Sequence, residues 1–222
     1  MTGASGGIGQ QVFAHYQDHE SIIGISNSKT IDCHSFGRTA RVDLTNSDAI
    51  AEFCDYHKNY LNELTIINMA VYSHDSLMAS IKSEEVTKTF EVNLFSNIYL
   101  VQNLIPIMIS ENFGRIIHIS SVVGQSGNVG AGIYAASKSA LIGYNKTLCK
   151  EYARFGITSN ILCLGYFEGG LINTLPKQEV DKIIKNIPSL RLGTSGEVIE
   201  AIDFLRSCSY INGEMINLQG GL

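Results

Sequence analysis

The segment Arg-Ile-Ile-His-Ile-Ser-Ser at 115–121 is followed by a glycine-rich connection and then by Tyr-Ala-Ala-Ser-Lys at 134–138, which opens a helical pattern reaching Glu151. The isoleucines of the first segment form a short β-branched run, which predicts a strand buried in a parallel sheet. In open α/β sheets the ligand crevice lies outside the carboxyl ends of the strands. We therefore expect Ser121, at the end of this strand, to lie at the crevice.

Tyr134 and Lys138 are four residues apart, so they share one face of the predicted helix. With Ser121 they would bring a hydroxyl, a phenol and an ammonium to one cleft, a combination that can protonate a carbonyl oxygen. A phenol has an ordinary pKa of about 10, too high for an efficient donor near neutrality, and an adjacent ammonium lowers it. A Tyr-x-x-x-Lys pair alone is more often a pair of surface neighbours; the upstream serine and a glycine-rich loop favour the catalytic interpretation.

The composition is that of an ordinary globular protein, with 222 residues, 45% hydrophobic residues, 17% charged residues and a net charge of −5. This length suits a single α/β domain over residues 1–222. The acidic balance argues against a nucleic acid partner, and we expect no membrane span. The five cysteines show no C-x-x-C spacing, so we expect no metal site and no disulfide framework, in a cytoplasmic protein.

A second glycine-rich stretch, Thr-Gly-Ala-Ser-Gly-Gly-Ile-Gly at 2–9, runs into a helical pattern that continues to about His19. Glycines let the backbone approach a pyrophosphate closely, and the N–H groups at a helix start attract anions. A buried strand normally precedes such a loop, yet only Met1 stands before Thr2. We therefore expect the first, central strand to be missing from this chain, with about six upstream residues rich in Val and Ile supplying it. Without it, the loop would be anchored on one side only.

The segment Ser21–Ser26 predicts the next strand, with Asn27, Ser28 and Lys29 after it. A carboxylate at this position would bond the ribose 2′-hydroxyl of NAD. The lack of a carboxylate, with a lysine close by, favours NADP(H) as the cofactor and leaves NAD(H) possible. The following strand is expected at 39–42, too soon to leave room for a full crossover helix.

The rest of the chain alternates between strand and helix, which predicts one doubly wound, Rossmann-like parallel sheet flanked by helices. The remaining strands are expected at 64–68, 157–163 and 214–218, and the helices at 47–60, 83–109, 132–155, 179–186 and 195–207. The predicted helix N-caps are Ser47 or Thr45, Ser83, and Ser195. Small residues on two long helices favour a homo-oligomer, a dimer or tetramer. An irregular segment at about 165–190 is the candidate substrate lid.

These residues together resemble the short-chain dehydrogenase/reductase family, and the resemblance covers the chain from Thr2 onward. Four residues match the positions of the family's catalytic tetrad: Asn93, Ser121, Tyr134 and Lys138. Within the family, four motifs are most similar to those of 3-oxoacyl-[acyl-carrier-protein] reductases: Gly114-Arg115-Ile-Ile, Ser120-Ser-Val-Val-Gly124, Gly127-Asn128 and Tyr134-Ala-Ala-Ser-Lys138.

The resemblance implies a role for each tetrad residue. Tyr134 would be the proton donor, Ser121 would orient the carbonyl, and Lys138 would bind the nicotinamide ribose and lower the pKa of the phenol. Asn93 would hold a water that relays protons to Lys138. The residues expected to bind the cofactor are Thr2, Gly3, Ser5, Gly7, Ile8, Gly9, Ser26, Asn27, Asp43, Leu44, Asn68, Ala70, Tyr134, Lys138, Gly165 and Phe167.

The chain also departs from the family pattern. The family's Asn-Asn-Ala-Gly stands here as Asn68-Met69-Ala70-Val71, and Gly169 replaces a threonine. Asn112 and Phe155 replace basic residues that carrier-protein reductases usually carry.

The leading hypothesis is an NADP(H)-dependent carbonyl reductase that acts on a 3-oxoacyl thioester, as in fatty acid biosynthesis, and assembles as a homotetramer or dimer. One alternative is a reductase of a keto sugar or secondary metabolite. The other is a non-enzymatic dinucleotide-binding sensor or inactive paralogue.

Overall fold

The computed structural model describes residues 1–222 except Ser28 and Thr30. The strands are β1 (Ile22–Ser26), β2 (Gly37–Arg41), β3 (Thr65–Asn68), β4 (Gly114–Ser121), β5 (Ile157–Leu164) and β6 (Met215–Leu218). The α-helices are α1 (Gly7–Gln17), α2 (Ser47–His57), α3 (Ser83–Phe90), α4 (Ser96–Glu111), α5 (Val123–Ser126), α6 (Gly132–Tyr152), α7 (Lys177–Asn186) and α8 (Ser195–Ser207). Short 3₁₀ turns lie at Lys58–Tyr60, Ala153–Phe155 and Leu171–Thr174, and a π-turn at Glu91–Phe95.

All strand pairs are parallel, in the order β2-β1 and β3-β4-β5-β6. Thr2 joins these two parts, because it forms parallel bridges with both Ile25 of β1 and Asn68 of β3. Its N–H donates to the Ile67 carbonyl at 3.0 Å, and the Met1 carbonyl accepts from the Ile25 N–H at 2.8 Å. The Rossmann-like parallel sheet is confirmed, but the expected anchorage of the glycine loop on one side only is wrong. Thr2 holds the loop from both sides.

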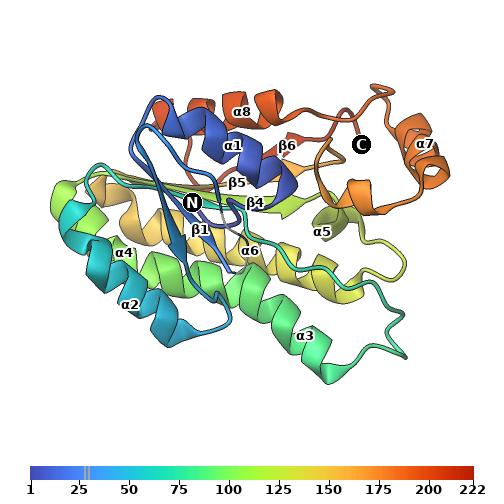
Figure 1. Ribbon diagram of the computed structural model, residues 1–222, viewed down its shortest axis with the longest axis horizontal. Helices are drawn as coiled ribbons and strands as arrows, with labels where there is room; N and C mark the ends of the chain where they lie inside the picture. The colour runs from blue at the N-terminus through green and yellow to red at the C-terminus, as the bar shows by residue number, and fades with distance from the viewer. Residues whose placement is uncertain (28, 30) are drawn as a thin grey trace.

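Helices cover both faces of the sheet, with α1 and α8 on one side and α2, α4 and α6 on the other (Figure 1). β4 is buried along nearly its whole length and β5 along all of it, as expected of central parallel strands that are covered on both faces. One apolar core lies on each side of these strands, and each contains residues from the helices that pack there. The carboxyl ends of the central strands are thereby fixed at one edge of the sheet.

The stretch Ser83–Glu111 is helical throughout, because the π-turn joins α3 to α4 without a break. By length and composition alone it could cross a membrane, a test that core helices of globular proteins also pass. The sequence predicts this helix at 83–109 and predicts no membrane span there. In the fold, α4 contributes buried residues to the larger core: Leu100, Val101, Leu104, Ile105 and Met108.

The helix starts differ from the sequence expectations by one residue. The N-cap of α2 is Asn46, whose side chain accepts from the N–H groups of Asp48 and Ala49, and neither Thr45 nor Ser47 has this role. The N-cap of α8 is Thr194 rather than Ser195. Lys82 occupies the cap position of α3, so Ser83 is the first helical residue instead of the cap.

Candidate active site

A cavity of about 930 Å³ lies at the carboxyl ends of the strands and is within the range of small-molecule sites. The predicted residues that line it are Gly3, Ser5, Gly7, Ile8, Gly9, Ser26, Asn27, Asp43, Leu44, Ala70, Ser121, Tyr134, Lys138, Gly165 and Phe167. Thr2, Asn68 and Asn93 are buried and do not line it. The cavity therefore joins the glycine-rich loop to the serine, tyrosine and lysine of the predicted tetrad.

Tyr134 and Lys138 lie in the first two turns of α6, and both side chains are buried. The Lys138 Nζ donates to the Ile119 carbonyl oxygen of β4 at 2.8 Å and lies 5.9 Å from the centroid of the Tyr134 ring. The Ser120 hydroxyl donates to the Lys138 carbonyl at 3.3 Å. These contacts fix the start of α6 against the end of β4, where Ser121 lines the same cavity.

Burial dominates the ionisation of both groups. It raises the pKa of Tyr134, with the Ser121 hydroxyl acting in the opposite direction, and it lowers the pKa of Lys138 to about 8. The pKa of Tyr134 is thus shifted upward, whereas the sequence-based expectation is that Lys138 lowers it. The physical reason is that desolvation penalises the phenolate, while the ammonium is engaged by the Ile119 carbonyl. The phenol consequently keeps its proton at neutral pH.

Asn93 lies in the π-turn and is fully buried. Its Oδ1 accepts from the Tyr72 N–H at 2.8 Å, and its Nδ2 donates to the Tyr72 carbonyl at 2.8 Å and to the Ser137 Oγ at 3.0 Å. Its own carbonyl accepts from the Asn97 Nδ2 at 2.7 Å. Asn93 thus connects the π-turn to the segment after β3. Through Ser137, the residue before Lys138, it also connects the π-turn to α6. π-turns inside helices occur frequently at functional sites.

The glycine-rich loop fits the diphosphate of a dinucleotide. Gly3 has a φ of +71°, and a Cβ there would lie 2.7 Å from the Ala70 backbone nitrogen, so only glycine allows this approach. The Thr2 hydroxyl accepts from the N–H groups of Met69 and Ala70 at 3.0 and 3.1 Å, which fixes the loop against the end of β3. Gly6, at the N-cap of α1, has no side chain to accept from the first-turn N–H groups, which can therefore serve an anion.

The end of β1 forms another part of the cavity wall, where Ser26, Asn27 and Lys29 line it. The Ser26 hydroxyl donates to the Lys29 carbonyl at 2.8 Å, and the Arg41 Nε donates to the Asn27 carbonyl at 2.8 Å. Ser28, which was part of the expectation about cofactor choice, lies outside the described residues.

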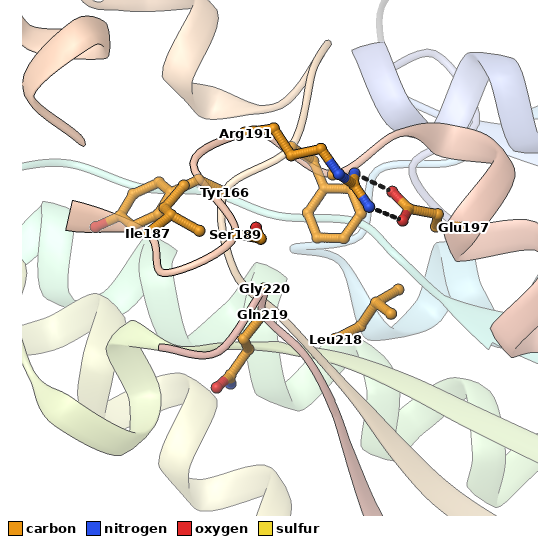
Figure 2. A pocket seen from close by; sticks show the side chains of 10 residues that line it. Tyr166, Ile187, Ser189, Arg191, Glu197, Leu218, Gln219 and Gly220 are labelled. Carbon is orange, nitrogen blue, oxygen red and sulfur yellow. Dashed lines mark hydrogen bonds and ion pairs between the residues drawn. The ribbon is translucent and has the colours of Figure 1, made fainter. Parts of the chain in front are cut away.

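The predicted lid segment is fixed at its base by backbone contacts. Phe167 is buried and pairs with Gly193, whose carbonyl accepts from the Glu168 N–H at 2.9 Å. Figure 2 shows a separate small cavity beside this base, where Arg191 forms a bidentate ion pair with Glu197. Its volume of about 40 Å³ suits a water molecule rather than a ligand.

Tyr72 and Lys88 are two of several cavity-wall residues that sequence reasoning missed. Neither belongs to a motif, and they are sixteen positions apart, Tyr72 in the loop after β3 and Lys88 in α3. One weak signal was available, because Lys88 precedes Val92 by one helical turn and Val92 also lines the cavity.

The chain is similar to known proteins over its whole length. The sequence model described as short chain dehydrogenase matches residues 1–180. A 3-oxoacyl-[acyl-carrier-protein] reductase FabG of Buchnera aphidicola subsp. Schizaphis graminum is 35% identical over an alignment that covers 100% of this chain and 95% of the relative. The protein of the same name from Haemophilus influenzae is 31% identical, with 100% and 96% covered. Nodulation protein G of a Rhizobium species is 31% identical, with 100% and 95% covered.

Proposed function

Since this chain belongs to the short-chain dehydrogenase family, we propose that it is an NAD(P)H-dependent reductase that converts the carbonyl of a 3-oxoacyl thioester into an alcohol. The observation that carries the proposal is the shared cavity, in which Ser121, Tyr134 and Lys138 meet the glycine-rich loop. The relatives named as 3-oxoacyl-[acyl-carrier-protein] reductases support the substrate class, since the alignments span this whole chain.

A reduced nicotinamide, when bound, supplies the hydride. Ser121 would hold the substrate oxygen by a hydrogen bond, and the protonated phenol of Tyr134 would donate the proton that the new alcohol requires. Burial raises the pKa of Tyr134 and so keeps the phenol protonated at neutral pH, as a proton donor must be, but it also makes the phenol a weaker acid than a group whose pKa lies near 7. Lys138 would bind the nicotinamide ribose. Asn93 would hold the Tyr72 backbone at the cavity wall, and it would hold a water that passes protons to Lys138.

NADPH is the proposed cofactor, with NADH accepted less well. Support comes from the end of β1, where Ser26, Asn27 and Lys29 line the cavity without a carboxylate to bond a ribose 2′-hydroxyl or repel a 2′-phosphate. The Lys29 cation would favour the phosphate. We further propose that the enzyme is cytoplasmic and homo-oligomeric, a tetramer or dimer.

The test is the oxidation of NADPH, followed by its absorbance, with acetoacetyl thioester and with a panel of keto sugars. Turnover of the thioester well above that of the sugars is expected. A preference for a keto sugar would redirect the substrate assignment. Binding of NADPH without turnover of any carbonyl would instead identify a dinucleotide-binding sensor or inactive paralogue.

A further inference from the structure

Lys88 is a cation in the wall of the cavity that the proposed chemistry does not use. It lies in the last turn of α3, and its side chain lines the cavity beside Tyr72. Its Nζ lies 4.4 Å from the centroid of the Tyr72 ring, within the distance at which an ammonium is attracted to an aromatic face. The ring therefore provides a platform that holds the ammonium at the cavity.

Tyr72 is itself fixed on two sides. The buried amide of Asn93 bonds both the N–H and the carbonyl of Tyr72 at 2.8 Å, as a neighbouring strand would. The phenol donates to the Glu85 Oε2 at 2.6 Å. Tyr72 is therefore held at its backbone and at its tip, and its ring gives the exposed Lys88 side chain a fixed aromatic contact at the cavity wall.

The nearby carboxylate of Glu85 forms no ion pair with Lys88, although the Tyr72 hydrogen bond and, less strongly, the Lys88 charge both lower the pKa of Glu85. Glu85 is engaged by the Tyr72 phenol, and His74 Nδ1 lies 3.6 Å from the same carboxylate oxygen. Throughout the described part of the chain, the ion pairs with N···O distances of 4.0 Å or less do not include Lys88. A cation at the wall of a ligand cavity, beside an aromatic ring and with no carboxylate within ion-pair distance, is suited to an anionic group of the ligand.

We propose that Lys88, supported by Tyr72, binds a phosphate group of a ligand that occupies the cavity. This inference rests on the proposed function, which supplies two sources of phosphate: the dinucleotide, and a thioester whose carrier is phosphorylated. Both sources offer the same chemistry to an ammonium, and they can be separated by experiment.

The experiment compares Lys88→Met, Lys88→Arg and the control Lys82→Met in the full chain. Lys82 is an exposed lysine at the start of the same helix and does not line the cavity. The measurements are the Kd of NADPH and of NADH, and the KM of acetoacetyl-coenzyme A and of the neutral acetoacetyl-N-acetylcysteamine. Each is recorded at low and high salt.

Lys88→Met should raise about fivefold, at low salt, the Kd of at least one dinucleotide or the KM of acetoacetyl-coenzyme A; Lys88→Arg should restore that constant, and high salt should reduce the difference. A loss with both dinucleotides identifies the diphosphate, and a loss with NADPH alone identifies the 2′-phosphate. A loss with the coenzyme A thioester alone identifies the substrate.

The proposal is overturned if Lys88→Met and Lys82→Met give the same constants while the wild-type protein binds and turns over normally. It is also overturned if the neutral thioester is affected as strongly as the phosphorylated one and both dinucleotides bind unchanged. The wild-type titration tests the proposed function separately, because a wild-type protein that binds neither dinucleotide contradicts that function and this inference together.

Discussion

The Lys138 ammonium is buried between β4 and α6, and this burial brings its pKa down to about 8. Because the charged form would bind the ribose, dinucleotide affinity should be full below pH 8 and fall as the pH rises through it. Between pH 7 and pH 9 the protonated fraction of such a group falls about tenfold, so the Kd should rise by up to about tenfold. Titrations at several pH values check this.

The Lys138→Met variant should bind the dinucleotide more weakly and lose this pH dependence. Lys150 is an exposed lysine of the same helix, and the Lys150→Met variant should keep the pH dependence. A Kd that stays constant from pH 7 to 9 in the wild-type protein would show that the Lys138 charge does not contribute to binding.

The catalytic motif was the most predictable part of the site, because its spacing is local. Tyr134 and Lys138 share a helix, and Ser121 ends the strand that precedes it. The pKa of Tyr134 was not predictable, since it depends on burial by the assembled fold rather than on the lysine one turn away. The Tyr72–Lys88 contact was equally unpredictable, because it needs the loop after β3 to pack against α3 and the buried Asn93 amide to hold Tyr72 in place.

At the scale of single elements, the capping box of α8 makes a direct prediction. The Thr194 side chain accepts from the Glu197 N–H, and the Glu197 carboxylate accepts from the Thr194 N–H at 2.9 Å. Thr194→Ala should therefore lower the free energy of unfolding by about 1 kcal/mol. Ser195→Ala, at the residue that the sequence favours as cap, removes only the exposed hydrogen bond from the Ser195 hydroxyl to the Gln11 Oε1, so it should lower the free energy of unfolding by less, about 0.5 kcal/mol. Urea unfolding of both variants measures these changes in the free energy of unfolding. A larger loss of stability for Ser195→Ala than for Thr194→Ala would contradict the assignment of Thr194 as the cap.

Most strands and helices were predictable because their hydrophobic patterns are clear, and errors concentrated at their ends. Runs such as Thr45-Asn46-Ser47 and Thr194-Ser195 contain several residues that can cap a helix. Only the backbone geometry selects one, here Asn46 and Thr194. The π-turn at Glu91–Phe95 lies inside an uninterrupted apolar helical pattern, so no local sequence signal predicts it.

At the scale of the whole molecule, distant segments meet at the glycine-rich loop. Thr2 links β1 to β3, which the sequence alone did not indicate because a single residue carries no strand pattern. Gly7 meets the lid segment, since a Cβ on it would fall well inside contact distance of the Gly169 carbonyl oxygen. The two glycines allow the lid and the phosphate loop to touch backbone to backbone.

Gly7→Ala should consequently force the lid segment away and lower the free energy of unfolding by about 1–3 kcal/mol. The matched control is Gly196→Ala, also in the first turn of a helix, where the nearest atom to a Cβ is the Thr194 Oγ1 at 3.8 Å. It should gain up to about 1 kcal/mol, because alanine favours helix more than glycine does. Equal effects in thermal unfolding would contradict the close approach of the two segments.

The measurement that tests the central claim most directly is the kcat of Tyr134→Phe beside its affinity for NADPH. The substitution removes only the hydroxyl that would donate the proton, and the buried ring remains. General acid catalysis is typically worth about 10²–10⁴ in rate, so kcat should fall by at least about a hundredfold while the Kd of NADPH stays within a few fold. A loss of kcat below about tenfold would show that another group protonates the substrate, and the assignment of Tyr134 would be wrong.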